Sequence, residues 1–404
     1  MDWGRRRTGT RAAARKRDTG NTVLRELPNQ PFDSTLLVVV VALVLLGIIV
    51  AYTTTYHKGL GHLQDHLMRV GVGFLALVLG MMVPHTFYGR WFRWVILLGA
   101  LGLLVATLVF GKTVKGAERW MEFSFLPFKL QPAEIAKFAL PMWLAAYFWD
   151  LEEKQKQERA FRNTLLWPGL VVFLFLGLTL LQRSIGTTFI MAVSALAILL
   201  LAGVRLYYFV PVLLTLSAML VGAILVYPHG WARLMGFLTG TPWQQVHAGL
   251  AIGSGGLFGA GVGGGAHSRL FVPEVNTDFA MAAICEEFGM FGTLGVFVLY
   301  GLFLWRGISI GLQASEHFGK YLAPGIAVTI FVYAMVHIGV SAGVLPTTGQ
   351  PLPYVSYGGT ALVANLFAAG VLLNISRFNR RRNAIHAGGG RNRGAHPPGP
   401  RAVI

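Results

Sequence analysis

The chain has 404 residues, of which 54% are hydrophobic and 13% charged, and a formal net charge of +17. An ordinary soluble domain carries about 25% charged residues, so this chain has too few charges to cover a compact soluble enzyme and too many apolar residues to stay disordered. Its single cysteine, Cys285, excludes a disulfide scaffold, which leaves a polytopic membrane protein.

Apolar stretches of membrane length run through the chain. Each has about 17–25 residues, enough to cross a ~30 Å hydrocarbon core as a helix. An open sheet cannot satisfy its backbone hydrogen bonds in lipid, so we predict an all-α polytopic membrane protein. The ten predicted transmembrane helices cover residues 34–53, 67–84, 92–110, 131–149, 164–181, 186–203, 207–227, 279–305, 321–344 and 359–375.

Two basic tails flank the predicted transmembrane domain, 34–376. The first tail, 1–33, precedes an apolar stretch without a cleavage pattern, which we interpret as a retained anchor. The second tail, 377–404, contains the Gly-, Pro- and Arg-rich run Gly388–Arg401 and is expected to be disordered.

The distribution of lysine and arginine predicts the orientation. With both ends in the cytoplasm, 24 of the 34 basic residues lie inside, nine lie outside and Lys137 lies within a span. This bias favours N-in and C-in topology, with the largest extracytoplasmic loop, 228–278, between helices 7 and 8. The basic excess is therefore an orientation signal that can also attract anionic membrane lipid, and it does not indicate nucleic acid.

Three segments are too polar or too broken to be simple connectors, and all three begin or lie on the predicted outer side: 111–137, 228–278 and 345–359. Any chemistry is therefore expected at the extracytoplasmic surface of the membrane.

The first polar segment ends with Glu134 and Lys137, three residues apart on one face of the fourth span. Acidic and basic groups at membrane depth often line functional cavities. A structural ion pair that neutralises itself within the helix bundle has the same spacing, so both interpretations remain open.

The second polar segment contains a glycine-rich stretch, Gly249–Gly265, whose backbone N–H groups could cradle a pyrophosphate. The alternative is a flexible loop at the membrane surface. The outer histidines His62, His247 and His267 lack metal-ligand spacing, so we predict no histidine metal site.

Asp278 stands where the longest outer loop meets the eighth span. Outer acidic residues are scarce, so a carboxylate at the mouth of the bundle is a candidate general base. The alternative is that Asp278, together with Thr277, only caps the helix that follows.

The third polar segment, Pro346–Pro353 followed by Ser356–Gly359, has three prolines in eight residues and cannot be a regular helix. Non-helical backbone at this depth is tolerated when it lines a cavity or is buried in protein. The residues alone are compatible with an enzyme, a transporter or a channel, although polar loops on one side argue mildly against a transporter with a midplane site.

The same segments resemble the SEDS family, the FtsW/RodA/SpoVE proteins of bacterial cell-wall synthesis. The matching motifs occur in the family's order across 115–376. They are KGAERW from Lys115, QPAEIAK from Gln131, GSGGLFGAG from Gly253, PEVNTDF from Pro273, EEFG from Glu286 and LPTTGQPLPYVSYGG from Leu345.

The resemblance implies a peptidoglycan glycosyltransferase of the bacterial cytoplasmic membrane with an extracytoplasmic active site. Its substrate would be lipid II, an undecaprenyl-pyrophosphate-linked disaccharide-pentapeptide, which is polymerised into β-1,4 glycan strands with inversion. No organic cofactor is implied. The implied partners are a class B penicillin-binding protein, other membrane proteins of the division or elongation machinery, and membrane lipid.

At the level of residues, Asp278 matches the family's essential aspartate and is expected to act as the base or as a ligand to Mg²⁺ or Mn²⁺. Basic residues, Lys115, Arg119 and Lys137 among them, are expected to neutralise the leaving group. The full set expected to bind substrate is Lys115, Arg119, Trp120, Gln131, Glu134, Lys137, Gln244, Glu274, Thr277, Thr347, Thr348, Ser356 and Tyr357.

The chain departs from the family pattern at several positions. Where the family often has Gln-Pro-Asp-Leu/Phe-Gly-Thr, this chain has Gln182-Arg-Ser-Ile-Gly-Thr187, so the usual acid is absent and Arg183 is gained. His247 replaces a common glutamine, Asn276 a frequent histidine and His337 a frequent asparagine.

The run Leu373–Arg377 resembles the division branch, FtsW, more than the elongation branch. Two alternative functions stay open beside polymerase: a lipid II flippase or transporter, and a non-catalytic activator of a penicillin-binding protein.

Overall fold

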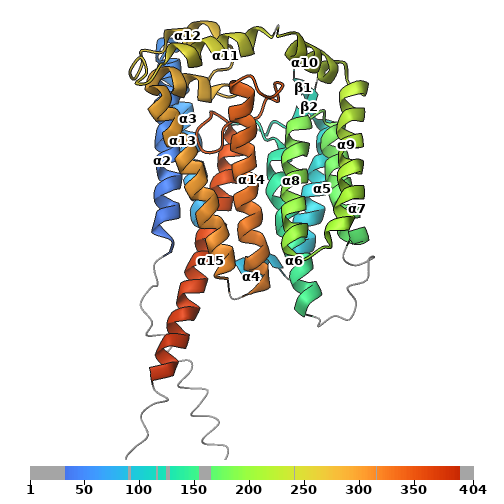
Figure 1. Cartoon of the computed structure of the whole chain (residues 1–404). Coiled ribbons are helices and arrows are strands. Elements are labelled where there is room, and N and C mark those ends of the chain that lie inside the picture. Colours follow the sequence, from blue (N-terminus) through green and yellow to red (C-terminus); the bar gives the residue numbers. More distant parts are fainter. Residues whose placement is uncertain are drawn as a thin grey trace, which may run out of the picture.

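The computed structural model describes residues 32–89, 92–114, 117–123, 128–153, 165–240, 242–314 and 316–391. Within these ranges the chain forms an upright bundle of helices (Figure 1), and a helix occupies each of the ten ranges predicted to span the membrane. Seven of the described helices are long and apolar enough to cross a membrane. These are α2 (Ser34–Thr55), α3 (Gly61–Met82), α5 (Phe92–Phe110), α9 (Phe209–Val226), α13 (Ala280–Leu312), α14 (His317–Ser341) and α15 (Gly359–Arg391).

Three further helices complete the bundle. The apolar helices α7 (Trp167–Leu181) and α8 (Ile185–Leu201) are shorter, with 15 and 17 residues. Helix α6 (Pro132–Glu153) has 22 residues and carries the charged pair Glu134 and Lys137. The all-helical expectation is therefore confirmed, while the number of spans is a separate question of topology.

The helices at the centre and at the edge of the bundle differ sharply in burial. In the most apolar part of α14 and α15, 72% of residues are buried, against 6% in the stretch that contains α9. The exposed side chains are large and apolar, for example Phe110 at 75% and Val226 at 72% exposure. Such an extensive apolar exterior requires lipid around it, so the chain is a multi-pass membrane protein.

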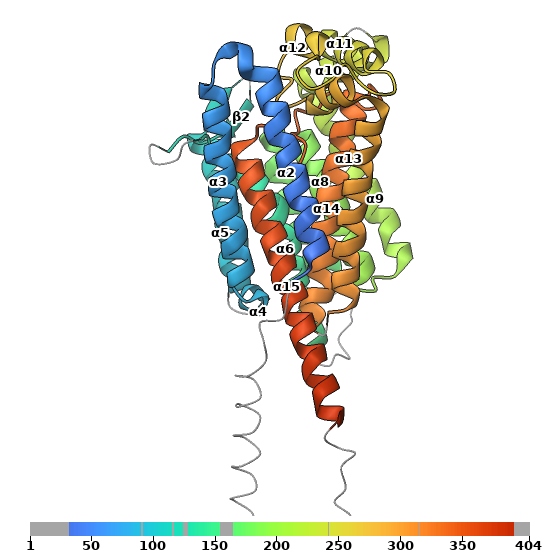
Figure 2. The same ribbon diagram turned by 90° about the vertical axis from the view of Figure 1, so that its left-hand side faces the viewer.

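The packing order explains which helices are central. Helix α3 lies along α15, and α14 packs against α6, α8 and α13 (Figures 1 and 2). At the end opposite the outer segments, Asp33 accepts a hydrogen bond from the N–H of Leu36 and so caps α2, and it also pairs with Arg306. The short helix α4 (His85–Gly89) lies at this same end (Figure 1).

The segment 228–278, predicted to be more than a simple connector, contains three helices. Helices α10 (Pro228–Thr239), α11 (Trp243–Ser254) and α12 (Ala266–Phe271) lie across the upper end of the bundle in Figure 1. The antiparallel strands β1 (Lys112–Val114) and β2 (Ala117–Trp120) are at the same end. The polar segments thus gather at one end, as the sequence predicted.

The glycine-rich stretch packs against a kink in α13 at Gly289, where φ is 64°. The N–H groups of Ala260 and Gly261 donate to the carbonyls of Glu286 and Glu287 at 2.8 and 3.0 Å. These two N–H groups are used within the protein, because the kink in α13 exposes carbonyls that need donors, and they do not contribute to a pyrophosphate cradle. For the rest of the stretch the cradle stays a prediction.

Gly259 is expected to be intolerant of substitution. Its φ is 81°, and an added Cβ would lie 2.2 Å from the carbonyl oxygen of Glu287. Gly259→Ala should therefore destabilise the protein by about 1–3 kcal/mol, measured by thermal unfolding in detergent. Gly253→Ala is the control, because Gly253 lies in α11 with open space around it. Equal unfolding temperatures for both variants would contradict this packing.

Helix α15 continues to Arg391, beyond the predicted domain boundary at 376. The first part of the predicted disordered tail is therefore helical. The sequence from 377 to 387 contains neither proline nor glycine, so the helix can continue through it.

Candidate functional site

A cavity of about 660 Å³ opens at the end of the bundle that carries the polar segments. Its wall comes from β2, α10, the segment before α13, and the loop between α14 and α15. Charged side chains on this wall are mostly basic. The described basic residues are Arg69, Arg119, Lys129, Arg183 and Arg233, and the described acidic residues are Glu274 and Asp278. This composition favours an anionic ligand.

Asp278 lies on the cavity wall, half-buried, immediately before α13. The helix is capped at Phe279 without any side-chain hydrogen bond at that cap. The hydroxyl of Thr277 instead donates to the carbonyl of Glu274 at 3.2 Å. The described cap of α13 therefore gives no support to the helix-cap alternative, and the carboxylate of Asp278 lies on the cavity wall close enough for its charge to act on Arg119.

On the cavity wall, Asp278 lies next to a left-handed turn at Gly349, where φ is 68°. A Cβ added to Gly349 would lie 3.7 Å from Oδ2 of Asp278. The left-handed conformation suits glycine and few other residues, so the turn brings bare backbone next to the carboxylate.

Three arginines from separate parts of the chain gather on the wall. Arg119 comes from β2 and donates from Nε to the carbonyl of Gln182 at 3.1 Å and from its guanidinium to the carbonyl of Arg183. Burial, together with the positive charges of Arg233 and Arg183, lowers the pKa of Arg119 to about 10, against the opposing effect of Asp278. Arg119 therefore stays protonated at neutral pH. A bound anion would reduce the repulsion between the three positive charges of the cluster.

Arg183 occupies the turn between α7 and α8 with φ at 60°. This left-handed conformation is uncommon for a residue with a side chain and costs on the order of 1–3 kcal/mol. The guanidinium lies 5.4 Å from the ring centroid of Tyr227, which also lines the cavity. Strained backbone of this kind is concentrated at functional sites.

The loop between α14 and α15 is non-helical, as its prolines predicted, and hydrogen bonds fix its shape. Buried Gln245 donates from Nε2 to the carbonyl of Leu345 at 2.7 Å. At its other end, the hydroxyl of Ser356 donates to the carbonyl of Thr277 at 2.8 Å, and the N–H of Tyr357 donates to that of Asn276 at 2.8 Å. The loop is therefore fastened to the segment that carries Asp278.

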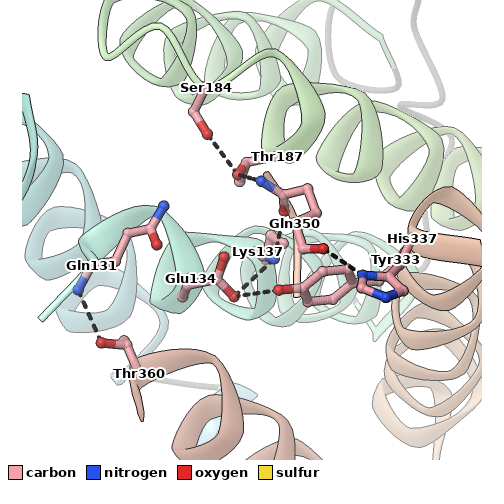
Figure 3. A network of polar contacts seen from close by, with 9 residues as sticks. All are labelled: Gln131, Glu134, Lys137, Ser184, Thr187, Tyr333, His337, Gln350 and Thr360. Carbon is pink, nitrogen blue, oxygen red and sulfur yellow. Dashed lines mark hydrogen bonds and ion pairs between the residues drawn. The ribbon is translucent and has the colours of Figure 1, made fainter. Parts of the chain in front are cut away.

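Glu134 and Lys137 lie beneath the cavity, within the helix bundle (Figure 3). Both side chains are buried, at 1% and 0% exposure, and Lys137 Nζ lies 2.8 Å from Glu134 Oε2. Tyr333 donates from its hydroxyl to the same oxygen at 3.2 Å. The two residues therefore form a buried ion pair that does not belong to the described lining of the cavity, and their role in substrate binding stays a prediction.

The predicted site residues fall into four groups. The residues on the cavity wall are Arg119, Trp120, Gln131, Glu274, Thr277, Asp278, Thr347, Thr348 and Tyr357. Below or behind the wall are Glu134, Lys137 and Ser356. Gln244 lies on α11, away from the described lining, although its neighbour Gln245 donates a hydrogen bond to the loop between α14 and α15. Lys115 lies outside the described residues.

Several wall residues were not singled out from the sequence. Arg69, Lys129 and Arg233 were visible only as members of the outer basic residues, and Arg183 only as a departure from the family pattern, so nothing in their spacing brought the four together. The Arg69 guanidinium lies 3.9 Å from the ring centroid of Tyr357, a cation–π contact between two residues of the cavity wall.

The described residues contain no group of three or more His, Cys, Asp or Glu side chains that could hold a metal ion. Asp278 is half-buried and Glu274 is exposed on the cavity wall. This donor set cannot form a complete protein cage, but one carboxylate is enough for a Mg²⁺ ion that keeps waters and shares phosphate oxygens.

The fold and cavity together define a polytopic α-helical membrane protein with an electropositive site at one end of its bundle. The chain belongs to the FtsW/RodA/SpoVE family, whose model, described as cell cycle protein, matches residues 33–381.

Curated relatives match most of the chain. A probable peptidoglycan glycosyltransferase FtsW from Geobacter metallireducens is 32% identical over 362 residues, covering 85% of this chain and 94% of the relative. A second one, from Tolumonas auensis, is 34% identical and covers 89% and 96%. The stage V sporulation protein E of Bacillus subtilis is 32% identical and covers 86% and 98%.

Solved structures have the same fold. A chain from a peptidoglycan synthase complex, described as coordinating polymerization and crosslinking, superposes with a TM-score of 0.71 at 25% identity, covering 86% of this chain and 98% of that one. The rod shape determining protein RodA of Thermus thermophilus gives 0.65 at 26% identity, covering 86% and 97%.

Proposed function

We propose that the chain is a peptidoglycan glycosyltransferase that polymerises lipid II at the outer face of the cytoplasmic membrane. The observation that carries this proposal is the placement of Asp278 on a cavity wall with three clustered arginines, Arg119, Arg183 and Arg233. A base and a diphosphate-binding cluster are what this reaction requires. The names of the curated relatives support the same activity.

The proposed chemistry balances within the site. The C4 hydroxyl of a GlcNAc attacks C1 of a MurNAc, Asp278 accepts the hydroxyl proton, and the C1–O bond to the diphosphate breaks. The polyprenyl diphosphate leaves with the bonding electrons, and attack from the opposite face inverts C1 to give a β-1,4 bond. The arginine cluster stabilises the charge that develops on the leaving diphosphate.

A divalent cation is proposed only as a companion of the substrate. Asp278 would be its protein ligand, and Mg²⁺ or Mn²⁺ would supply further neutralisation of the diphosphate. The proton acceptor and the arginine cluster do not depend on that ion.

The proposed topology has ten spans with both ends in the cytoplasm. It is supported by the 24-to-nine distribution of basic residues and by helices in all ten predicted ranges, and it counts α6, α7 and α8 as spans. In this orientation the cavity opens on the extracytoplasmic side, where polymerisation would take place.

The likeness of Leu373–Arg377 to the division branch, and the names of the relatives, support a role in cell division. We propose a class B penicillin-binding protein as the partner, because a strand-forming enzyme needs a crosslinking one. The related synthase complex, which joins polymerization with crosslinking, supports this pairing. Other division or elongation proteins would bind within the same membrane assembly.

Removal of the Arg119 guanidinium is expected to weaken lipid II binding by about tenfold to a hundredfold, because a hydrogen bond to a charged group contributes about 1.5–3 kcal/mol. Arg119→Gln should also reduce competition by inorganic pyrophosphate. Arg269→Gln is the matched control, since Arg269 binds Tyr56 and the Gly263 carbonyl at the same end of the molecule. Equal losses in both variants would exclude a specific role for Arg119.

The function is tested by reconstituting the full chain, with and without the penicillin-binding protein, and supplying lipid II with a divalent cation. Glycan ladders are the expected product. Lipid II that crosses the vesicle bilayer without polymer would favour a transporter. Polymer that forms only in the presence of a catalytically competent partner polymerase would favour a non-catalytic activator.

A further inference from the structure

A buried network of polar side chains connects α6, α8 and α14 to the loop between α14 and α15 (Figure 3). Its centre is Gln350, which is 3% exposed. The preceding residues Thr348 and Gly349, and Pro351 after it, all line the cavity. Gln350 therefore points into the protein while its neighbours form the cavity wall.

Gln350 is held by three different helices. Its Nε2 donates to the hydroxyl of Thr187 on α8 at 3.1 Å. Its Oε1 accepts from Nζ of Lys137 on α6 at 3.3 Å. Its backbone carbonyl lies 2.7 Å from Nδ1 of His337 on α14. A loop residue fixed at three points cannot shift without breaking buried hydrogen bonds.

His337 connects the same turn to the helix that follows Asp278. The N–H of Met281, the second residue of α13, donates to Nε2 of His337 at 3.4 Å. Because Nε2 accepts this bond, the ring proton lies on Nδ1 and is donated to the Gln350 carbonyl. One neutral imidazole thus joins the two segments that carry Gly349 and Asp278.

Two residues in and beside the network differ from the family pattern. Ser184 stands at the position of the acid in the family's Gln-Pro-Asp pattern, and its hydroxyl lies 2.8 Å from that of Thr187. His337, which contacts the Gln350 carbonyl, stands where the family often has asparagine. The Oε1 of Gln350 is a neutral second partner for Lys137 beside Glu134.

We propose that Gln350 is a positioning residue for glycosyl transfer: through Thr187, Lys137 and His337 it fixes the Gly349 turn against the carboxylate of Asp278. This inference rests on the proposed function and adds a residue that touches neither substrate nor reacting atoms. Its effect is expected on turnover, since a displacement of about 1 Å at a reacting centre can cost about a hundredfold in rate.

The test compares full-length variants in the lipid II polymerisation assay, together with the number of lipid II molecules bound per protein. Gln350→Met keeps the size of the side chain but removes both of its hydrogen bonds. Turnover is expected to fall about 10- to 100-fold with unchanged binding stoichiometry and dissociation constant. Thr187→Val removes one anchor only and should give a smaller loss in the same direction.

Two further variants separate positioning from folding. Gln350→Asn keeps an uncharged amide that can donate to Thr187 and accept from Lys137 but shortens the side chain, so it should lose less turnover than Gln350→Met. Ser194→Ala removes an equally buried hydroxyl on α8, which lies 2.7 Å from the hydroxyl of Thr329 and does not contact the loop. This variant should keep wild-type turnover.

Wild-type turnover in Gln350→Met, or a parallel fall of turnover and binding stoichiometry, would overturn the positioning role while leaving the polymerase intact. A wild-type chain that forms no glycan under any partner condition would instead overturn the proposed function and this inference with it.

Discussion

Asp278→Asn is expected to reduce glycan formation by about 10²–10⁴-fold, the usual contribution of a positioned general base. The amide keeps the size of the side chain but cannot accept the proton of the attacking hydroxyl. Lipid II should still bind, because Arg119, Arg183 and Arg233 remain on the wall and one opposing negative charge is lost. Initial rates of polymerisation at saturating lipid II, beside a direct binding measurement, check this expectation.

The matched control for that variant is Glu122→Gln. Glu122 pairs with Lys129 at 2.8 Å at the same end of the molecule, and it does not belong to the described lining of the cavity. This change from carboxylate to amide should leave the rate near that of the wild type. Glycan formation that continues unchanged in Asp278→Asn would remove Asp278 from the mechanism.

Lys137→Met is expected to destabilise the protein by about 3–5 kcal/mol, because it leaves a carboxylate buried without its counter-ion. Glu134 is 1% exposed, and its Oε1 has no hydrogen-bond partner, so the ammonium of Lys137 is its main compensation. Thermal unfolding in lipid-containing detergent micelles should show a clearly lower midpoint than for the wild type.

The double variant Glu134→Gln/Lys137→Met is the informative comparison. It removes both charges, and pairs of this kind can often be replaced by neutral groups of similar size without loss of stability. The double variant should therefore be more stable than Lys137→Met alone. Equal midpoints for the two would show that the buried ion pair contributes little.

The sequence predicted the helices well because lipid imposes a simple rule on them. An apolar run of membrane length, such as Ser34–Thr55, has few folds available other than a helix. The charge distribution also predicted that the polar segments share one end, which places Asp278, Arg119 and the loop after α14 in one region.

The sequence could not predict contacts that depend on exact register and depth. The pattern over 228–278 contains many glycines, yet most of it folds into α10, which packs against α9, and into α11 and α12, which pack against α13. The spacing of Glu134 and Lys137 fits both a cavity wall and a buried pair, and only the position of α6 below the cavity decides between them. Gln350 lies in a motif that the sequence did single out, but its contacts carried no signal, since its partners lie on three distant helices.

The central claim is that this chain itself forms glycosidic bonds at the cavity that contains Asp278. The most direct measurement is the stoichiometry between undecaprenyl pyrophosphate released and β-1,4 bonds formed by the purified chain from labelled lipid II. We expect one diphosphate to be released for each bond formed, and both products to be lost together in Asp278→Asn. Lipid II that crosses the bilayer with no diphosphate released and no bond formed would contradict it.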